Sequence, residues 1–401
     1  MAAAVTFGSD ALAEGTDFLD QIFEAFETSG AQGSSNSNLG TISLTAHVTP
    51  DLTVAVTFHG TNINSGGTIT DLSVAINDVN NFSASGLDIS ADDVNAAINE
   101  TDLELKFADV AKLFTGIDWT ASLSALTVGS YVHGTGGDDN FTMTSASDMI
   151  GLDGGNDTDN LGGGDDMILA GNGVYAIRPG VSNLDGGEGS DTFALDNRDG
   201  VNIAPFFSTG QTVDLQKGSF TYQDDLGVAT FNFVSVENVR GSQFNDKLLG
   251  DAGANNLEGE EGNDKLTGRN GNDGLVGDDG NDKLIGGAGA DMLTGGAGGD
   301  HFIYGAATDS NKQRDVITDF THKVDKLDIS ALKLPKHDEF TLIGDHKFDH
   351  HAGEIRIVDF NSKGTANDFT MVSVDLDGNG KPDLQIELTG LIHLDKNDFI
   401  F

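Results

Sequence analysis

The residues best suited to chemistry are acidic side chains that recur every nine positions between Gly241 and Ile303. Seven nine-residue units follow one another without a gap, and each unit opens with glycine. Carboxylate and backbone carbonyl oxygens, with no thiol nearby, are ligands for a hard metal ion. A flexible cage of six or more oxygens suits Ca²⁺ better than Mg²⁺. The sixth residues of the units, which are the candidate ligands, are Asp246, Asn255, Asp264, Asp273, Asp282, Asp291 and Asp300.

The eighth residue of every unit is apolar, and it indicates which element positions these ligands. It is leucine in all units except the last, which has Phe302. So much glycine would destabilise a helix by about 1 kcal/mol per residue, and a strand period of two fits only the residues around each leucine. The pattern predicts a flat solenoid in which a six-residue turn, with glycine at positive φ, alternates with a three-residue strand. Each leucine then points inward and stacks on the leucine two units later.

The same stacking gathers the sixth residues into two columns. Two carboxylates about 4 Å apart repel each other by roughly 1 to 4 kcal/mol, depending on the effective dielectric. The columns therefore need a cation between successive coils. We expect the roll to stay unfolded where calcium is scarce and to fold where calcium is plentiful. A disordered Gly/Asp linker is the alternative, but a linker has no reason to keep leucine in register.

On these residues, the segment resembles the RTX family of calcium-binding β-rolls, whose nine-residue repeat is a known form of parallel β-helix. The resemblance implies one Ca²⁺ between sixth residues that lie two units apart. Asn255 departs from the motif, and it should weaken the site to which it contributes. The implied pairs are Asp246 with Asp264, Asp264 with Asp282, Asp282 with Asp300, Asn255 with Asp273, and Asp273 with Asp291.

Weaker units precede this array, at 134–142, 151–159, 162–169 and 186–194. Residues 200–242 lie between the two arrays and alternate as strands do. Their final VENVRGS run is similar to the segment that commonly leads into a further roll in RTX proteins. We therefore expect two rolls joined by a strand-rich insert. The upstream candidate ligands are Asp139, Asp157, Asp166 and Asp191.

The last hundred residues contain less glycine and more alternation. The runs at 315–332 (DVITDFTHKVDKLDISAL) and 375–390 (DLDGNGKPDLQIELTG), together with the final DFIF, resemble the C-terminal region of serralysin-type secreted proteases. In such proteins this region caps the roll and carries an uncleaved signal for the type I secretion machinery. A secretion signal in this region would also explain how the protein is exported although its first fifteen residues, which lack Lys and Arg, do not resemble a secretory signal peptide.

A separate group of oxygen ligands lies in the C-terminal region. Its D-x-D-x-N spacing is that of a calcium loop, but the twelfth position is Ile386 rather than the glutamate of an EF-hand. A further Ca²⁺ and a plain Asp/Gly turn both fit this spacing. The residues concerned are Asp375, Asp377, Asn379 and Asp383.

The overall charge limits the partners. Acidic residues outnumber basic ones 64 to 21, which gives a net charge of −43. This balance argues against nucleic acid and membrane insertion, because nucleic acids and anionic membranes attract clustered Lys and Arg. The absence of cysteine excludes disulfides and thiolate metal sites. No apolar run approaches the roughly 18 residues of a spanning helix. We expect a protein secreted by a Gram-negative bacterium, with calcium ions as its cofactor.

Residues 1–130 predict an α+β domain. Helices are expected at 16–28, where apolar residues share one face, and at 91–115, after a capping box at Ser90 and Asp93. Strand alternation fills 40–60 and 66–76. The predicted fold is mainly β, with parallel β-rolls between this domain and a β-rich cap. The expected boundaries are 1–130 for the α+β domain, 131–199 for the first roll, 200–240 for the insert, 241–303 for the main roll and 304–401 for the cap with its secretion signal.

Signatures of catalysis are missing from the sequence. There is no HExxH zinc motif and no GxSxG nucleophile elbow, so neither the serralysin protease chemistry nor a lipase is expected. Acidic pairs such as Asp92 and Asp93 are better explained as solvated surface. His346, His350 and His351 could take a transition metal, although a polar loop between strands is the simpler interpretation.

Three classes of function remain. The sequence favours a non-enzymatic calcium-binding protein of the cell surface or matrix, such as an adhesin, a biofilm component or a surface-layer subunit. Self-assembly or binding of a cell-surface polysaccharide would then be its mode of action. The alternatives are a carrier of a small ligand such as haem, and an extracellular polysaccharide-acting enzyme of unrecognised type.

Overall fold

Strands dominate the part of the chain that the computed structural model describes, so the predicted mainly β fold is confirmed. The helices predicted at 16–28 and 91–115, as well as Asp139, lie outside that part. No described helix is long and apolar enough to cross a membrane. The described residues are 32–36, 41–49, 52–61, 68–76, 79–90, 119–122, 131–133, 140–143, 145–152, 156–170, 180–195, 209–224, 227–310, 314–335, 338–360 and 368–401.

The chain forms two compact units. The first contains residues 1–193, 197–206 and 221–236, and the second contains residues 194–196, 207–220 and 237–401. Two strands include residues of both units, namely β13 (Thr192–Ala194) and β15 (Ser219–Asp224).

The first unit begins with antiparallel strands that follow one another in sequence. The alternation predicted at 40–60 and 66–76 is found as β2, β3 and β4. Each strand from β1 to β6 pairs with the next in antiparallel fashion, through short connections as far as β5 and across the longer segment 91–118 between β5 and β6. The strands are β1 (Gln32–Asn36), β2 (Thr41–Thr49), β3 (Leu52–Thr61), β4 (Thr68–Ile76), β5 (Val79–Ser90) and β6 (Trp119–Ser122).

A parallel roll follows in the same unit. One sheet pairs β7, β9 and β11, with Tyr131, Met149 and Met167 in register. The other sheet runs from β6 through β8, β10 and β12 to β16, all in parallel pairs. The strands are β7 (Tyr131–His133), β8 (Asn140–Thr142), β9 (Met149–Leu152), β10 (Thr158–Asn160), β11 (Met167–Ala170), β12 (Gly180–Asp185) and β16 (Gly227–Val234).

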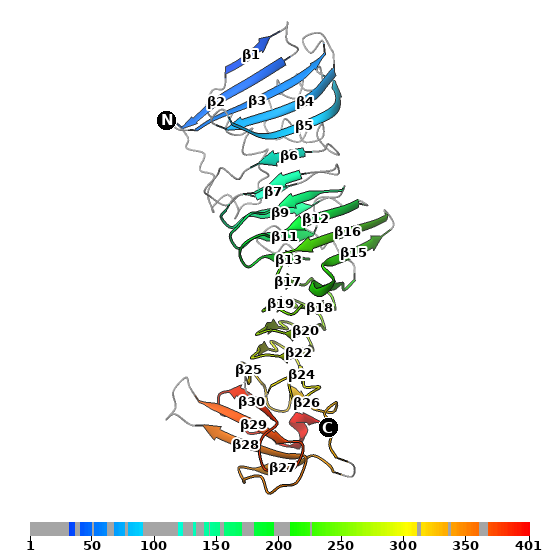
Figure 1. Cartoon of the computed structure of the whole chain (residues 1–401), viewed down its shortest axis with the longest axis vertical. Helices are drawn as coiled ribbons and strands as arrows, with labels where there is room; N and C mark the ends of the chain where they lie inside the picture. Colours follow the sequence, from blue (N-terminus) through cyan, green and yellow to red (C-terminus); the bar gives the residue numbers. More distant parts are fainter. Residues whose placement is uncertain are drawn as a thin grey trace. The chain divides into compact units, whose positions relative to one another are not determined.

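The second unit contains the seven uninterrupted repeats, whose strands alternate between two parallel sheets (Figure 1). The first sheet has the order β14, β18, β20, β22, β24, β26, β31. Its strands are β14 (Thr212–Asp214), β18 (Lys247–Leu249), β20 (Lys265–Asn270), β22 (Lys283–Ala288), β24 (His301–Ile303), β26 (Lys326–Asp328) and β31 (Phe399–Ile400).

The second sheet of this unit continues into the C-terminal region. Strands β17, β19, β21, β23, β25 and β30 are parallel, whereas β28, β29 and β30 form an antiparallel meander and β27 pairs in parallel with β28. The strands are β17 (Asn238–Arg240), β19 (Asn256–Glu258), β21 (Gly274–Val276), β23 (Met292–Thr294), β25 (Asp315–Ile317), β27 (Thr341–Gly344), β28 (Glu354–Phe360), β29 (Phe369–Asp375) and β30 (Leu384–Thr389). Short 3₁₀ helices occupy Leu215–Lys217 and Lys396–Asp398.

The core of the second unit is two stacks of apolar side chains, as the repeat predicts. Leu248, Leu266, Leu284 and Phe302 are in register in the first sheet, and each has no exposed surface. The stack continues past the repeats to Leu327 and Phe399. The second sheet holds the equivalent stack of Val239, Leu257, Leu275, Leu293, Ile317 and Leu388. The cap therefore extends the same core and covers the end of the roll.

The turns use glycine for close approach as well as for positive φ. The fourth residue of a unit packs on the turn one coil earlier, where a Cβ on Gly280 or Gly298 would overlap a backbone carbonyl. Positive φ falls at the second residue of several units, and there Glu260, Arg269 and Asp278 adopt it although they are not glycine. The prediction that glycine supplies the left-handed positions is therefore only partly correct.

Leu284 tests the stacked core. We expect Leu284→Ala to lower the free energy of unfolding by about 2–5 kcal/mol, because it leaves a cavity in a fully buried stack. Urea unfolding in the presence of calcium measures this loss. Met292→Ala is the matched control, because Met292 is 59% exposed and its truncation should change stability by no more than about 0.5 kcal/mol. Equal effects of the two substitutions would contradict the predicted roll core.

Candidate metal centre

The sixth residues of alternate units form a continuous hydrogen-bonded column. The backbone N–H of Asp246 donates to Oδ1 of Asp264 over 2.7 Å, and Asp264 donates in the same way to Asp282 over 2.7 Å. Asp282 donates to Asp300 over 2.9 Å, and Asp300 donates to Asp325 over 3.0 Å. All five side chains are buried. The predicted pairs of this column are therefore next to each other in the fold.

A second column faces the other sheet. Asn255 donates its backbone N–H to Oδ1 of Asp273 over 2.9 Å, and Asp273 donates to Asp291 over 2.9 Å. Asp291 then donates to Asp315 over 3.1 Å. The two columns together include every candidate ligand of the main array.

Asp315 and Asp325 are members of these columns that the nine-residue spacing did not identify. They lie 24 and 25 residues after their partners, rather than 18, because longer connections precede their strands. Each is nonetheless two residues before an inward-facing apolar residue, Ile317 or Leu327, as in the repeat. This D-x-apolar signal could have revealed both.

One oxygen of most column carboxylates remains available. The Oδ2 atom accepts no hydrogen bond in six buried members of the columns, although burial makes an unsatisfied acceptor costly. Asp246 and Asp325, at the two ends of the first column, differ. Oδ2 of Asp246 accepts the backbone N–H of Ser242 over 2.6 Å, and Oδ2 of Asp325 accepts the backbone N–H of Thr321 over 2.6 Å. The carboxylates with an unpartnered Oδ2 are Asp264, Asp273, Asp282, Asp291, Asp300 and Asp315.

The first glycine of each unit leaves space beside that oxygen. A Cβ on Gly259 would lie 2.5 Å from Oδ2 of Asp264 and 2.7 Å from the carbonyl oxygen of Gly277. A Cβ on Gly277 would likewise lie 2.5 Å from Oδ2 of Asp282 and 2.5 Å from the carbonyl oxygen of Gly295. Carboxylate and carbonyl oxygens of successive coils thus converge where glycine has no side chain. This donor set fits Ca²⁺, which takes several protein oxygens in flexible geometry.

The electrostatics of the columns also call for a cation. The pKa of Asp264 is raised to about 8, mainly by burial and also by neighbouring Asp246 and Asp282, against the lowering effect of a backbone N–H. Burial likewise raises the pKa of Asp273 and Asp282 to about 7 and that of Asp300 to about 6. Without a bound cation, a substantial share of these carboxyl groups would therefore be protonated near neutral pH.

Asn255 shows how the column manages without a full carboxylate. Its Oδ1 accepts the backbone N–H of Asp251 over 2.8 Å, and its Nδ2 donates to the carbonyl oxygen of Glu237 over 2.8 Å. The amide N–H thus meets a carbonyl oxygen that would otherwise face another acceptor. Both polar groups of the Asn255 side chain therefore have hydrogen-bond partners without a cation, which is consistent with the weakened calcium site expected there.

The upstream candidates are partly assembled in the first unit. The backbone N–H of Asp148 donates to Oδ1 of Asp166 over 2.7 Å, and Asp166 donates to Asp191 over 2.9 Å. Burial raises the pKa of Asp166 to about 7, and its Oδ2 has no hydrogen-bond partner. Asp148 was missed by the sequence reasoning, although it too precedes an inward-facing residue, Ile150, by two positions.

Asp157 belongs to the other side of this roll and is not part of that column. Its Oδ2 accepts the hydroxyl of Ser182 over 2.7 Å. Two residues later, Asp159 occupies the inward position that Phe141 and Leu184 hold on the neighbouring strands. Burial raises the pKa of Asp159 well above its usual value.

The C-terminal oxygen loop closes as a turn around one buried carboxylate. Asp375 accepts the backbone N–H groups of Gly378, Asn379 and Gly380. Oxygens of Asp375, Asp377 and Asp383 lie within 4.8 Å of one another. Asn379 instead accepts the N–H of Lys381 through its side chain. Three of the four predicted ligands are thus brought together. This geometry fits both a calcium loop and a plain Asp/Gly turn.

The three histidines of the 344–351 segment do not form one site. His351 contacts Asp349, and these two lie with Glu354 in a mixed cluster. His346 contacts the carbonyl oxygen of Ile343, and the ring of His350 lies against Gly380.

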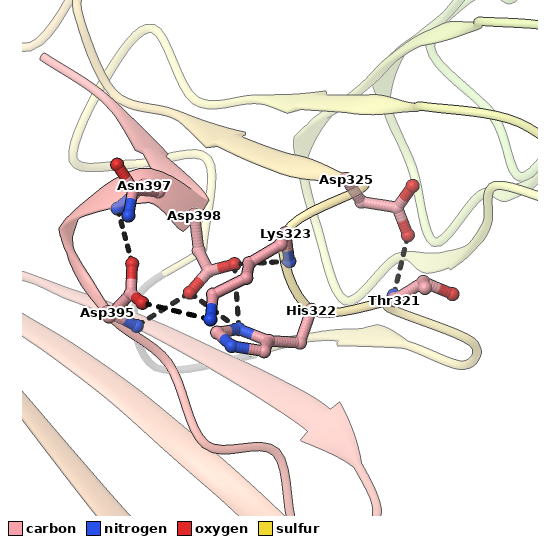
Figure 2. A network of polar contacts seen from close by, with 7 residues as sticks. All are labelled: Thr321, His322, Lys323, Asp325, Asp395, Asn397 and Asp398. Atoms are coloured by element: carbon pink, nitrogen blue, oxygen red, sulfur yellow. Dashed lines mark hydrogen bonds and ion pairs between the residues drawn. The ribbon is translucent and has the colours of Figure 1, made fainter.

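A polar network fixes the last strand to the end of the roll (Figure 2). The carboxylate of Asp398 has no exposed surface, and both its oxygens lie 3.0 Å from Nδ1 of His322. It also accepts the backbone N–H groups of Lys323 and Asp395, over 2.7 and 2.6 Å. Because Asp398 directly precedes β31, this network holds Phe399 on the core stack.

Calcium-free stability should fall as the pH rises. The folded carboxyls have pKa values of about 6 to 8, above the unfolded value of about 3.9, so protonation favours the folded roll. This stabilisation is complete below the unfolded pKa of about 3.9 and is lost progressively as the pH rises through the folded pKa values of about 6 to 8. We expect a higher melting temperature at pH 5 than at pH 8 in chelator, measured by circular dichroism. The opposite trend in chelator would contradict the geometry of the columns.

Asn255→Asp should create a further calcium site and weaken the calcium-free fold. The new carboxylate would face the Glu237 carbonyl oxygen without a donor, which costs about 1–3 kcal/mol. Isothermal titration calorimetry should find one more bound Ca²⁺ than in the unmodified chain. Asn263→Asp is the control, because Asn263 is exposed and lies outside the columns. An unchanged stoichiometry in Asn255→Asp would show that the column does not bind calcium at this coil.

Comparison with known proteins places the chain in a family. No curated protein matches it. Among solved structures, an AlgE6R3 subunit of the Azotobacter vinelandii mannuronan C5-epimerase is 26% identical, with a TM-score of 0.21 over 40% of this chain and 80% of that one. The extracellular lipase LipA from Serratia marcescens is 17% identical, with a TM-score of 0.21, and the match spans 68% of this chain but only 42% of the lipase.

The family comparison covers most of the sequence. The profile described as peptidase M10 serralysin C terminal matches residues 86–401, which include both rolls and the cap. The RTX resemblance of the repeats and the serralysin-like C-terminal region are thereby confirmed together. The chain belongs to the peptidase M10 serralysin C-terminal family, and is thus an RTX-type protein of a secreted, calcium-binding kind.

Proposed function

We propose that this protein folds on calcium outside the cell and serves there as a non-enzymatic surface or matrix component. The observation that carries the proposal is the set of buried Oδ2 atoms without hydrogen-bond partners in the two columns. They make the folded roll incomplete until a cation supplies the missing positive charge. Such a protein can leave the cell as an open chain and become rigid only after export.

Mass action supports the switch. A site that binds calcium only in the folded state stabilises it by RT ln(1 + [Ca]/Kd), which is about 2.7 kcal/mol at a calcium concentration one hundred times Kd. A domain is stable by only about 5–15 kcal/mol. Several such sites in the columns therefore suffice to decide whether the roll folds.

The proposal of a non-enzymatic role rests on the hydrogen bonds that the buried carboxylates make. Those of the columns each accept a backbone N–H from the preceding coil, which fixes them in structural positions. Asp398 is similarly held by two backbone N–H groups and His322. With no recognisable catalytic motif in the sequence, a repetitive and rigid roll suits a structural or adhesive task best.

Purified full-length chain should respond to calcium in two ways. In chelator at pH 8 we expect a weak β signal and a low melting temperature in circular dichroism, and in millimolar calcium a cooperative melting transition at a higher temperature. Electron microscopy of the calcium-loaded protein should then show sheets or filaments. An identical melting curve with and without calcium would refute the folding switch. Folded but monodisperse protein that instead gains a Soret band with haem, or degrades an extracellular polysaccharide, would refute the surface or matrix role.

A further inference from the structure

A column of basic side chains runs along the outward face of the first sheet of the second unit. The strand register places Lys247, Lys265, Lys283, His301 and Lys326 side by side on successive strands. Each precedes an inward-facing residue of the core stack by one position, so its own side chain points outward. The three lysines of β18, β20 and β22 are exposed, whereas His301 and Lys326 are half-buried. Figure 1 shows these strands stacked along the roll.

The fold does not require this column. Neighbouring strands are about 4.8 Å apart, and like charges placed directly opposite each other are destabilising. The equivalent outward positions of the second sheet hold Asn256, Gly274, Met292 and Val316, all uncharged. The basic residues are therefore a property of one face of the roll.

The lysines of the column are not used within the described part of the protein. None of the four forms an ion pair with a described carboxylate. The lysines of β18, β20 and β22 also do little for the acidic columns behind them, because the pKa values of Asp264 and Asp282 are set mainly by burial, a backbone N–H and neighbouring carboxylates; only Lys326 lowers the pKa of a column member, Asp325. In a chain of net charge −43, a row of unpaired cations points to an external anion.

The column beside the lysines is mainly aliphatic. Two residues further along each strand, the same outward face presents Leu249, Thr267, Ile285 and Ile303, followed by Asp328 at the Lys326 end, all half-buried. Neither column contains Phe, Tyr or Trp. The face therefore offers a line of positive charge beside a line of apolar surface.

We propose that this basic column binds a linear acidic polysaccharide, a chain of uronic acids laid along the roll. Such a chain carries one carboxylate per sugar ring, and the strand spacing is about the length of one ring. The C–H faces of the rings can rest on the aliphatic column. The inference rests on the proposed surface or matrix role and names its partner.

Two other polyanions fit less well. Single-stranded nucleic acid is normally held by aromatic side chains on which bases stack, and these columns have none. A membrane offers a plane of charge, whereas this basic surface is one side chain wide.

The test uses the full chain saturated with calcium and a fluorescent oligogalacturonate of defined length, with binding followed by anisotropy. We expect the triple variant Lys247→Gln, Lys265→Gln and Lys283→Gln to bind about tenfold or more weakly, and added salt to weaken binding by the unmodified chain. The triple variant with arginine at the same three positions should keep its affinity. Lys333→Gln, Lys381→Gln and Lys396→Gln, combined, give the same change of charge at exposed sites elsewhere and should have little effect.

Calcium-dependent circular dichroism of the same samples establishes that each variant is folded. Loss of oligogalacturonate binding by a folded variant then reports on the basic column alone. It leaves the proposed folding switch and surface or matrix role to be judged by their own assays. If the glutamine triple does not fold, the single Lys265→Gln variant should still bind a few-fold more weakly. The proposal is overturned if unmodified protein does not bind oligogalacturonate, or binds a neutral maltooligosaccharide or a single-stranded oligonucleotide equally well. It is also overturned if the folded lysine variants bind as the unmodified chain does, since calcium bridging alone would then explain binding.

Discussion

The structure depends on carboxylates that are stacked, buried and only half satisfied. In each column one oxygen accepts a backbone N–H from the coil before it, and the other faces space beside a glycine. The first oxygen makes the side chain part of the backbone ladder and fixes its position. The second leaves negative charge inside the roll, where the low dielectric makes it expensive. This buried charge is the basis of the proposal that folding and cation binding are one event.

The same geometry explains why the repeat tolerates so little variation. The first glycine must lack a Cβ because oxygens of two coils converge there, and the fourth because its backbone touches the preceding turn. The second position is freer, since Glu260, Arg269 and Asp278 occupy it at positive φ. Such residues cost roughly 1–2 kcal/mol in that conformation. The glycine pattern therefore marks contacts between coils more than turn conformation.

Hydrogen bonds and apolar contacts within the protein complete the two ends of the roll. At one end, Asn255 uses its amide N–H where a carboxylate would need a cation. At the other, Asp325 is satisfied by Thr321, and the core stack passes through Leu327 to Phe399 on the last strand. The contact between His322 and Asp398 holds that strand in place (Figure 2). The cap thus closes the open sheet edges by pairing them and covers the apolar core.

The sequence alone determined the repeat, the alternation of turn and strand, the stacked leucines and the acidic columns. It could do so because a strict nine-residue period leaves a single way to bury Leu266 on Leu284 and Asp264 beside Asp282. Where the period is lost, tertiary structure decided which residues become neighbours. Asp315 and Asp325 join the columns across longer connections, and Asp191 joins Asp166 across 25 residues in the first roll, because strand pairing rather than sequence distance sets their neighbours. The basic face likewise appears only when register brings Lys247, Lys265 and Lys283 onto the same side of one sheet.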